Sequence, residues 1–144
     1  HRDLHSFPTR RSSDLEDGCI KLFTLWRALV ARGADPELFT VGTYAPAAFA
    51  GSLVGNVFGF WRAFEGRTAL AVVPWRIADL GAAQGAFVLG EAWEDTRVTD
   101  LPAGWGPLTD VMTGRTYSGE GLALRELFRD FPVALLTGGT AGGE

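Results

Sequence analysis

The sequence predicts a mainly β fold, in which an antiparallel β-sandwich is preceded by a single α-helix. Short runs rich in β-branched and aromatic residues recur along most of the chain, and turns containing glycine or proline separate them without an intervening helix. Helical periodicity is limited to one segment near the start. The 144 residues, of which 47% are hydrophobic, are enough for one domain with a substantial core.

The helical segment covers residues 19–32. Leu22, Trp26 and Leu29 recur at steps of three and four residues, a spacing typical of the apolar face of a helix. Gly33 is expected to end the helix, because glycine readily adopts the conformation that follows a last helical turn. The apolar arc is wide, which indicates contacts on more than one side of this helix.

The strands are expected in short runs that begin after this helix. Their expected ranges are 38–44, 57–64, 68–73, 86–89, 96–101, 108–113 and 133–136. Residues 65–67, Glu-Gly-Arg, predict a hairpin turn between the second and third runs. The last run is apolar on both faces, so we expect it inside a sheet, with Phe128 and Phe131 contributing to the core beside it.

The two ends of the chain differ from the part between them. Residues 137–144 are mostly glycine, threonine and alanine with little to bury, and we expect them to form a disordered tail. Residues 1–15, which contain both histidines, show no periodicity and resemble a translated sequencing adapter, so we expect them to be non-native. Residues 16–34 then form the helical part, and residues 35–136 form the β-domain.

Composition argues against several classes of function. The formal net charge is −4 and the arginines are scattered, so no nucleic-acid partner is expected. One cysteine and two histidines cannot build a Cys/His zinc site, and no cofactor is expected. Cys19 is expected to be a buried thiol in a cytoplasmic protein. Residues 38–61 are uncharged, but Pro46 interrupts them and leaves fewer than the ~20 residues that a membrane helix needs, so no membrane association is expected.

The acidic residues do not predict a catalytic pair. Glu91, Glu94 and Asp95 occur together in a polar turn between strands, where solvated carboxylates are usual and no apolar pocket is indicated to raise a pKa. Asp110 is expected to be a turn or hydrogen-bonding residue ahead of Gly114. No catalytic or metal-binding residue is predicted in this chain.

The five tryptophans are many for a chain of this length. Trp26 and Trp61 have apolar neighbours and are expected to be buried. Trp75, Trp93 and Trp105 are flanked by turns, and for them both burial and contact with a carbohydrate remain open. Two or more of these three rings on one exposed face would favour starch or glycogen binding.

An ordered set of short motifs carries a family resemblance. In the second half these are residues 93–96 (Trp-Glu-Asp-Thr), Leu101, Pro102, Trp105, residues 110–114 (Asp-Val-Met-Thr-Gly), Leu127, Phe128 and residues 131–136 (Phe-Pro-Val-Ala-Leu-Leu). In the first half they are residues 27–29, residues 36–39, Gly42, Tyr44, Pro46 and residues 72–74. From Lys21 to Leu136 the chain resembles the C-terminal end of malto-oligosyltrehalose synthases, which belong to the α-amylase superfamily.

The resemblance implies a fragment of an isomerase of trehalose biosynthesis. Such enzymes convert the reducing-end α-1,4 linkage of a maltooligosaccharide to α,α-1,1 by intramolecular transglucosylation, using an aspartate nucleophile and a glutamate acid/base on a (β/α)8 barrel. A retaining mechanism requires these two carboxyl groups to lie about 5 Å apart. The family motifs that carry them lie upstream of the last barrel helix, so the resemblance assigns no catalytic residue here.

The resemblance also implies the partners of this chain. Residues 16–34 would be the last helix of the missing barrel, which would be the partner of the β-domain, and maltooligosaccharide would be bound by the parent enzyme. Two alternatives remain open: a free-standing starch- or glycogen-binding β-sandwich module, and the C-terminal domain of another α-amylase relative.

Overall fold

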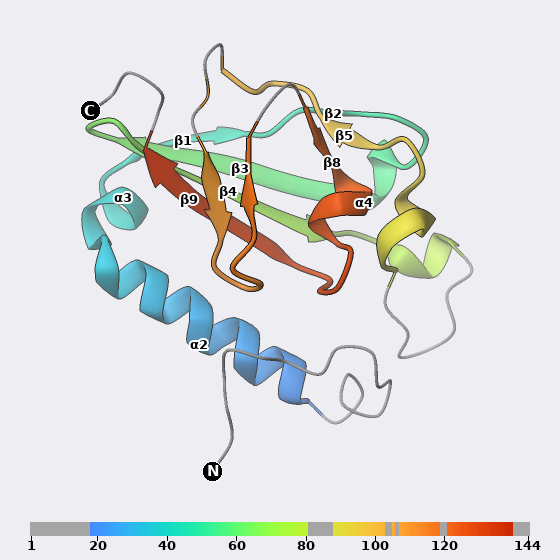
Figure 1. The fold of residues 1–144 in the computed structure, drawn as a ribbon, viewed down its shortest axis with the longest axis horizontal. Helices are drawn as coiled ribbons and strands as arrows, with labels where there is room; N and C mark the ends of the chain where they lie inside the picture. The colour runs from blue at the N-terminus through green and yellow to red at the C-terminus, as the bar shows by residue number, and fades with distance from the viewer. Residues whose placement is uncertain (1–17, 81–87, 103–104, 106, 119–120, 140–144) are drawn as a thin grey trace.

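Two antiparallel β-sheets and a few helices make up the computed structural model, which describes residues 18–80, 88–102, 105, 107–118 and 121–139 (Figure 1). In spatial order, the larger sheet contains β1 (Thr43–Pro46), β3 (Val57–Phe64), β4 (Arg67–Pro74), β9 (Ala134–Gly139), β6 (Leu108–Asp110) and β7 (Thr116–Tyr117). The smaller sheet contains β2 (Phe49–Ala50), β5 (Arg97–Val98) and β8 (Leu122–Ala123). The helices are α2 (Cys19–Ala34), α3 (Pro36–Thr40), α4 (Leu124–Leu127) and the 3₁₀ turns η1 (Val54–Asn56), η2 (Ile77–Leu80) and η3 (Gly90–Trp93). The predicted mainly β, antiparallel fold with one long helix is confirmed.

The hairpin of β3 and β4 forms the longest strand pair of the larger sheet. Its two-residue turn, Glu65–Gly66, has positive φ at both positions (51° and 83°), as the right-handed twist of the flanking strands favours. Strand β3 has the predicted bounds, and β4 extends the predicted strand by one residue at each end. The predicted hairpin turn between these two strands is therefore confirmed.

Strand β9 lies between β4 and β6, as expected for a run that is apolar on both faces. Its burial is nearly complete at Ala134, Leu135 and Leu136. The strand continues past Leu136 to Gly139, where the sequence was expected to fray. Gly138 explains part of this difference, because a Cβ atom on it would lie 2.5 Å from the carbonyl oxygen of Pro107, so the close approach needs glycine. The remaining residues of the expected tail, 140–144, lie outside the described residues.

The larger sheet has a hydrophobic core on each face. The core toward the smaller sheet contains Leu70, Val72 and Leu136 from the larger sheet together with Val98, Leu122, Leu124, Leu127 and Phe128. The core on the opposite face joins α2 to the sheet and contains Ile20, Phe23, Met112, Phe131 and Leu135. Figure 1 shows α2 and the smaller sheet on opposite sides of the larger sheet. Phe128 and Phe131 are both fully buried, as expected, but they belong to different cores.

The strand expected at residues 38–44 is wrong over its first part. Residues Pro36–Thr40 form helix α3, and β1 begins only at Thr43. The Asp35 carboxylate accepts a hydrogen bond from the backbone N–H of Leu38 (3.4 Å), and Pro36 occupies the first helical position. Asp followed by Pro is a helix-start signal, and this local signal outweighed the β propensity of the residues that follow.

Other expected boundaries shift by a few residues. Helix α2 runs through Gly33 to Ala34, so this glycine does not end it. The expected strand at 96–101 is reduced to Arg97–Val98, and the one at 108–113 stops at Asp110. For the expected strand at 86–89, residues 86 and 87 lie outside the described residues, whereas Val88 and Leu89 are not in a strand.

Candidate functional site

Helix α2 is attached to the β-domain by one of its faces. Ile20 and Phe23 are buried there, and the rings of Phe23 and Phe131 meet edge to face with centroids 5.5 Å apart. Farther along the helix, the Arg27 Nε–H donates a hydrogen bond to the backbone oxygen of Val111 (2.6 Å). These contacts fix which face of α2 points away from the sheet.

The outward-pointing face of α2 is apolar and exposed. Leu22, Leu25 and Leu29 are 71%, 56% and 53% exposed, and Trp26 and Val30 beside them are also exposed. The prediction that Trp26 is buried is therefore wrong, and so is that for Cys19, which is exposed. Both residues belong to a helix of which the described residues cover only one face. We name Leu22, Leu25, Trp26, Leu29 and Val30 the outer face of α2.

The three tryptophans considered for carbohydrate contact lie in different environments. Trp93 is fully buried, and its Nε1–H donates a hydrogen bond to the backbone oxygen of Val88 (2.9 Å). Trp105 is half-buried and packs against the core between the sheets, whereas Trp75 is 59% exposed. The three rings therefore do not form one exposed surface. Trp61 is partly buried against that same core, in line with its expected burial.

A different set of aromatic residues shares one exposed sheet face. Tyr44 on β1 and Phe58 and Phe60 on β3 lie on the face that also carries α2, and Trp75 follows directly after β4. We name these four residues the aromatic strip. The sequence contains one signal for it, since Phe58, Phe60 and Phe64 alternate with other residues along the predicted strand 57–64.

The turn that contains Glu91, Glu94 and Asp95 is exposed, and two of its carboxylates are hydrogen-bonded to Ser52. The Ser52 hydroxyl oxygen lies 2.7 Å from Glu94 Oε1 and 2.6 Å from Asp95 Oδ1, and the Ser52 backbone N–H donates to the same Asp95 oxygen (2.9 Å). The hydrogen bonds from Ser52 lower the pKa of Asp95. Glu91 lies 3.7 Å from Arg125 instead. Solvated and paired carboxylates of this kind match the structural interpretation of the turn, and the lowered pKa of Asp95 is the opposite of what a general acid needs.

Asp110 is a buried hydrogen-bonding residue at the end of β6, directly before the turn to β7. Its Oδ1 accepts hydrogen bonds from the backbone N–H groups of Met112 (2.9 Å) and Leu135 (3.2 Å). Burial raises the pKa of Asp110 to about 6, against the opposing influence of these hydrogen bonds and of Arg115. Its Oδ2 makes no hydrogen bond within the described part of the chain. The expected turn role of Asp110 is confirmed, and the residue ties β6 to β9 by its side chain.

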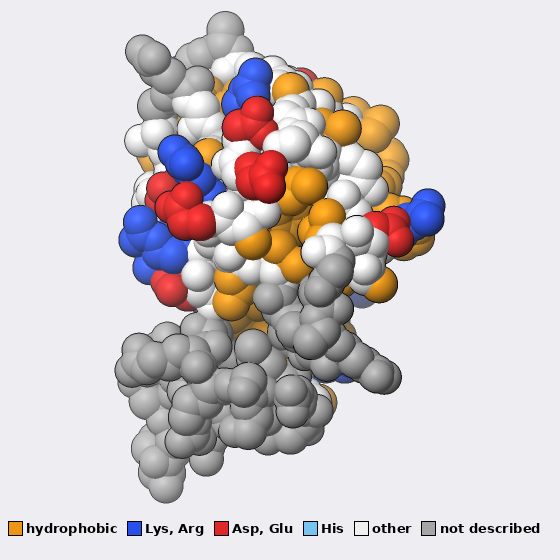
Figure 2. Space-filling model, turned by 90° about the vertical axis from the view of Figure 1, so that its right-hand side faces the viewer, with side chains coloured by type: hydrophobic (Ala, Val, Ile, Leu, Met, Phe, Trp, Pro, Cys, Tyr) orange, Lys and Arg blue, Asp and Glu red, His pale blue; other side chains and the backbone are white. Residues whose placement is uncertain are grey.

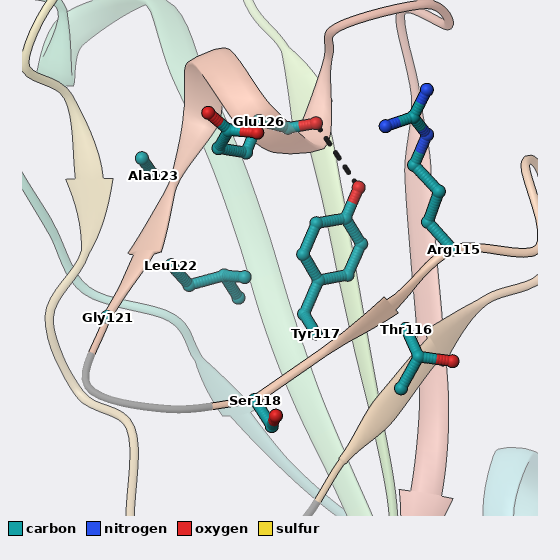
Figure 3. Close-up of a pocket in the computed structure, with 8 residues that line it drawn as sticks. All are labelled: Arg115, Thr116, Tyr117, Ser118, Gly121, Leu122, Ala123 and Glu126. Carbon is teal, nitrogen blue, oxygen red and sulfur yellow. Dashed lines mark hydrogen bonds between the residues drawn. The ribbon is translucent and has the colours of Figure 1, made fainter.

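An open cleft of about 430 Å³ lies beside β7 and α4 (Figure 3). The Tyr117 hydroxyl donates a hydrogen bond to the backbone oxygen of Glu126 (3.2 Å), and burial raises the pKa of Tyr117 to about 12. Arg115 pairs with Asp130, and the Glu126 carboxylate contacts Arg129 (3.4 Å). Because structural partners already occupy these charged groups, the cleft has room for a small polar molecule but presents no catalytic arrangement.

Several surface charges of the described residues form ion pairs, among them Arg67 with Asp35, Arg76 with Asp79 and Arg115 with Asp130. On the face shown in Figure 2, acidic and basic side chains lie next to one another, with hydrophobic side chains between them. In the described ranges, no group of three or more His, Cys, Asp or Glu side chains is placed to hold a metal ion. No helix within these same ranges has the length and apolar character to cross a bilayer.

Comparison with known proteins gives no match: no family model, no curated protein and no solved structure matches this chain.

Proposed function

We propose that this chain is the C-terminal accessory domain of a malto-oligosyltrehalose synthase, a cytoplasmic isomerase. In this proposal α2 is the last helix of the (β/α)8 barrel, and the two sheets form a β-sandwich that steadies the barrel. The chain itself contributes no catalytic group. The order of motifs between Lys21 and Leu136 supports the family, and the outer face of α2 supports the role.

The outer face of α2 is the single observation that carries the role of a docked domain. A helix with one face in water has an apolar stripe on one side only, whereas a helix that is apolar nearly all round is covered on both sides. In α2, Phe23 points into the domain while Leu25 and Leu29 point out of it. Complete burial of each leucine would stabilise a complex by about 1.5–3 kcal/mol. A barrel that covers this face would account for its composition.

The chemistry of the described residues also supports a non-catalytic role. Retaining transglycosylation needs a carboxylate nucleophile and a protonated partner in a site that shields them from water. Glu94 and Asp95 are exposed and bonded to Ser52, while Asp110 is used in holding two strands together. We therefore place the reaction in the barrel.

A binding experiment tests this proposal. The purified chain is mixed with a malto-oligosyltrehalose synthase shortened to end before its last barrel helix, and complex formation is followed by analytical ultracentrifugation. We expect a 1:1 complex with the wild-type chain and none with Leu25→Glu/Leu29→Glu. Val54→Glu is the matched control, because Val54 is similarly exposed but lies on η1. A folded wild-type chain that forms no complex would contradict the proposal.

The alternative of a starch- or glycogen-binding module loses its original support. That alternative required two or more of Trp75, Trp93 and Trp105 on one exposed face. Trp93 is fully buried and Trp105 is half-buried against the core, so only Trp75 of the three is exposed. A module of that kind would also have no need for a long apolar helix face. We retain carbohydrate contact only for the aromatic strip, which is a different set of residues.

A further inference from the structure

The aromatic strip is built by strand alternation on the α2 side of the larger sheet. Tyr44 is paired with Arg62, so their side chains lie on the same face of the sheet. Phe60 lies two residues from Arg62 on β3 and therefore shares this face with Tyr44. Phe58 lies two residues from Phe60 on the same strand and faces the same way. The backbone N–H of Trp75 donates to the backbone oxygen of Asn56 (2.8 Å). This bond continues the ladder of β3 and β4 by one residue, which puts Trp75 on the face of Val73 and Phe58.

The rings of the strip are exposed and partly fixed. Tyr44 is 55% exposed, Phe58 is 48% exposed, and Phe60 between them is partly buried. The rings of Tyr44 and Phe60 are stacked, with centroids 5.3 Å apart and planes 29° apart. Side chains two residues apart on a strand are about 7 Å apart, so Phe58 and Phe60 form successive steps of one surface. Stacked rings on a sheet have little conformational freedom left to lose when a ligand binds.

The middle of the strip lacks charged residues, whereas charged residues lie near both of its ends. No charged residue occurs between Leu38 and Trp61 in the sequence. Near Tyr44, the Arg62 guanidinium donates hydrogen bonds to the backbone oxygens of Leu38 (3.1 Å) and Gly42 (2.9 Å). Just after Trp75, Arg76 pairs with Asp79 (3.1 Å). Among the described residues, the two arginines near the ends of the strip therefore already have partners, which makes the strip a poor site for an anionic polymer. A neutral ligand with apolar faces would lose no charge solvation there.

We propose that the aromatic strip is a binding surface for an α-1,4-linked glucan. The C–H faces of glucose rings would lie on Tyr44, Phe58 and Trp75, and their hydroxyl edges would stay in water or meet the Arg76 and Asp79 pair. The choice of an α-1,4 linkage rests on the proposed function, whereas the choice of a neutral sugar rests on the rings and their lack of charge. The site differs from the outer face of α2, which is mainly aliphatic and suits a protein partner.

Titration of the purified chain with maltoheptaose, followed by isothermal calorimetry, tests this inference. Cellohexaose serves as a glucan of the other linkage. We expect maltoheptaose to bind, with an affinity reduced at least tenfold by Trp75→Ala or Tyr44→Ala. Trp26→Ala is the matched control, since Trp26 is an exposed tryptophan on α2 outside the strip, and we expect it to leave the affinity unchanged. Circular dichroism of each variant shows whether its fold is retained.

Several results would overturn the inference. Wild-type chain that binds neither glucan contradicts it, and this outcome is separate from the docking result, which depends on Leu25 and Leu29. Binding of cellohexaose alone contradicts the α-1,4 assignment. Equal loss of maltoheptaose affinity in Trp26→Ala would move the site to α2. If the shortened synthase shields Trp75 from fluorescence quenching while no glucan binds, the strip is a protein contact instead.

Discussion

At the scale of single residues, Asp110 links the turn chemistry of the sequence to the stability of the sheet. Its position ahead of Gly114 predicted a turn residue, and its carboxylate also reaches across to the backbone N–H of Leu135. The second contact joins residues that are 25 positions apart, so no local pattern could have shown it. Burial of the carboxyl group follows from this long-range contact and raises its pKa to about 6.

The raised pKa of Asp110 predicts a pH-dependent free energy of unfolding. The unfolded pKa is about 3.9, so the folded protein holds this proton more tightly. The contribution of Asp110 to the free energy of unfolding is fully present below about pH 4 and is lost as the pH rises through about 6. A shift of two pKa units corresponds to a decrease of about 3 kcal/mol. We expect Asp110→Asn to remove this pH dependence while keeping an oxygen for Met112 and Leu135. Urea unfolding of both proteins at pH 4, 5, 6 and 7.5 measures the difference.

Comparison of the two proteins at each pH isolates the contribution of Asp110. Hydrogen bonds from Arg67 and Ser52 lower the pKa values of Asp35 and Asp95, which gives a trend of the opposite sign, and both residues are unchanged in the variant. If the free energy of unfolding changes with pH in the same way in the wild type and in Asp110→Asn between pH 4 and 7.5, the Asp110 carboxyl group does not cause the pH dependence.

At the scale of elements, regular patterns predicted β3, β4 and most of α2, because alternation, turn residues and helical periodicity are local properties. The same reasoning failed where one local signal competes with another. Asp35 and Pro36 start a helix in a stretch that otherwise favours a strand, and the glycines after Leu136 continue β9 instead of fraying. Pairing with β4 and a close contact with Pro107 decided the second case, and neither is visible from the residues themselves.

The glycine pair of β9 provides a test of this packing. A Cβ atom on Gly138 would lie 2.5 Å from the Pro107 carbonyl oxygen, whereas one on Gly139 has its nearest atom at 3.6 Å. We expect Gly138→Ala to destabilise the protein by about 1–3 kcal/mol, the usual cost of forcing atoms into a filled space. Gly139→Ala is the control and should change stability little. Equal effects of the two substitutions in chemical denaturation would show that β9 does not extend as described.

At the scale of the whole molecule, the exposed hydrophobic side chains are unevenly distributed. Of the ten large ones exposed among the described residues, five lie on α2 and three belong to the aromatic strip. Apolar periodicity showed that α2 would have contacts on two sides, but the sequence could not show which side this chain covers. That depended on Phe131 and Leu135, which are distant in sequence and take the inner side. The aromatic strip could not be predicted in the same way, because its rings come from β1, β3 and the end of β4. These rings share a face only once the pairing of these strands is known.

The uncovered face of α2 predicts how the isolated chain behaves in solution. A contiguous apolar surface of this kind promotes self-association and binds hydrophobic dyes. We expect the wild-type chain to enhance the fluorescence of anilinonaphthalene sulfonate and to associate as its concentration rises, and Leu25→Glu/Leu29→Glu to reduce both. The double variant removes two outward leucines without touching Ile20 or Phe23, so its folded structure should persist. Val54→Glu should leave dye binding close to that of the wild type, because Val54 lies on η1 and outside this surface. If Val54→Glu lowered dye binding as much as the double variant did, the outer face of α2 would not be the dominant apolar surface of this molecule.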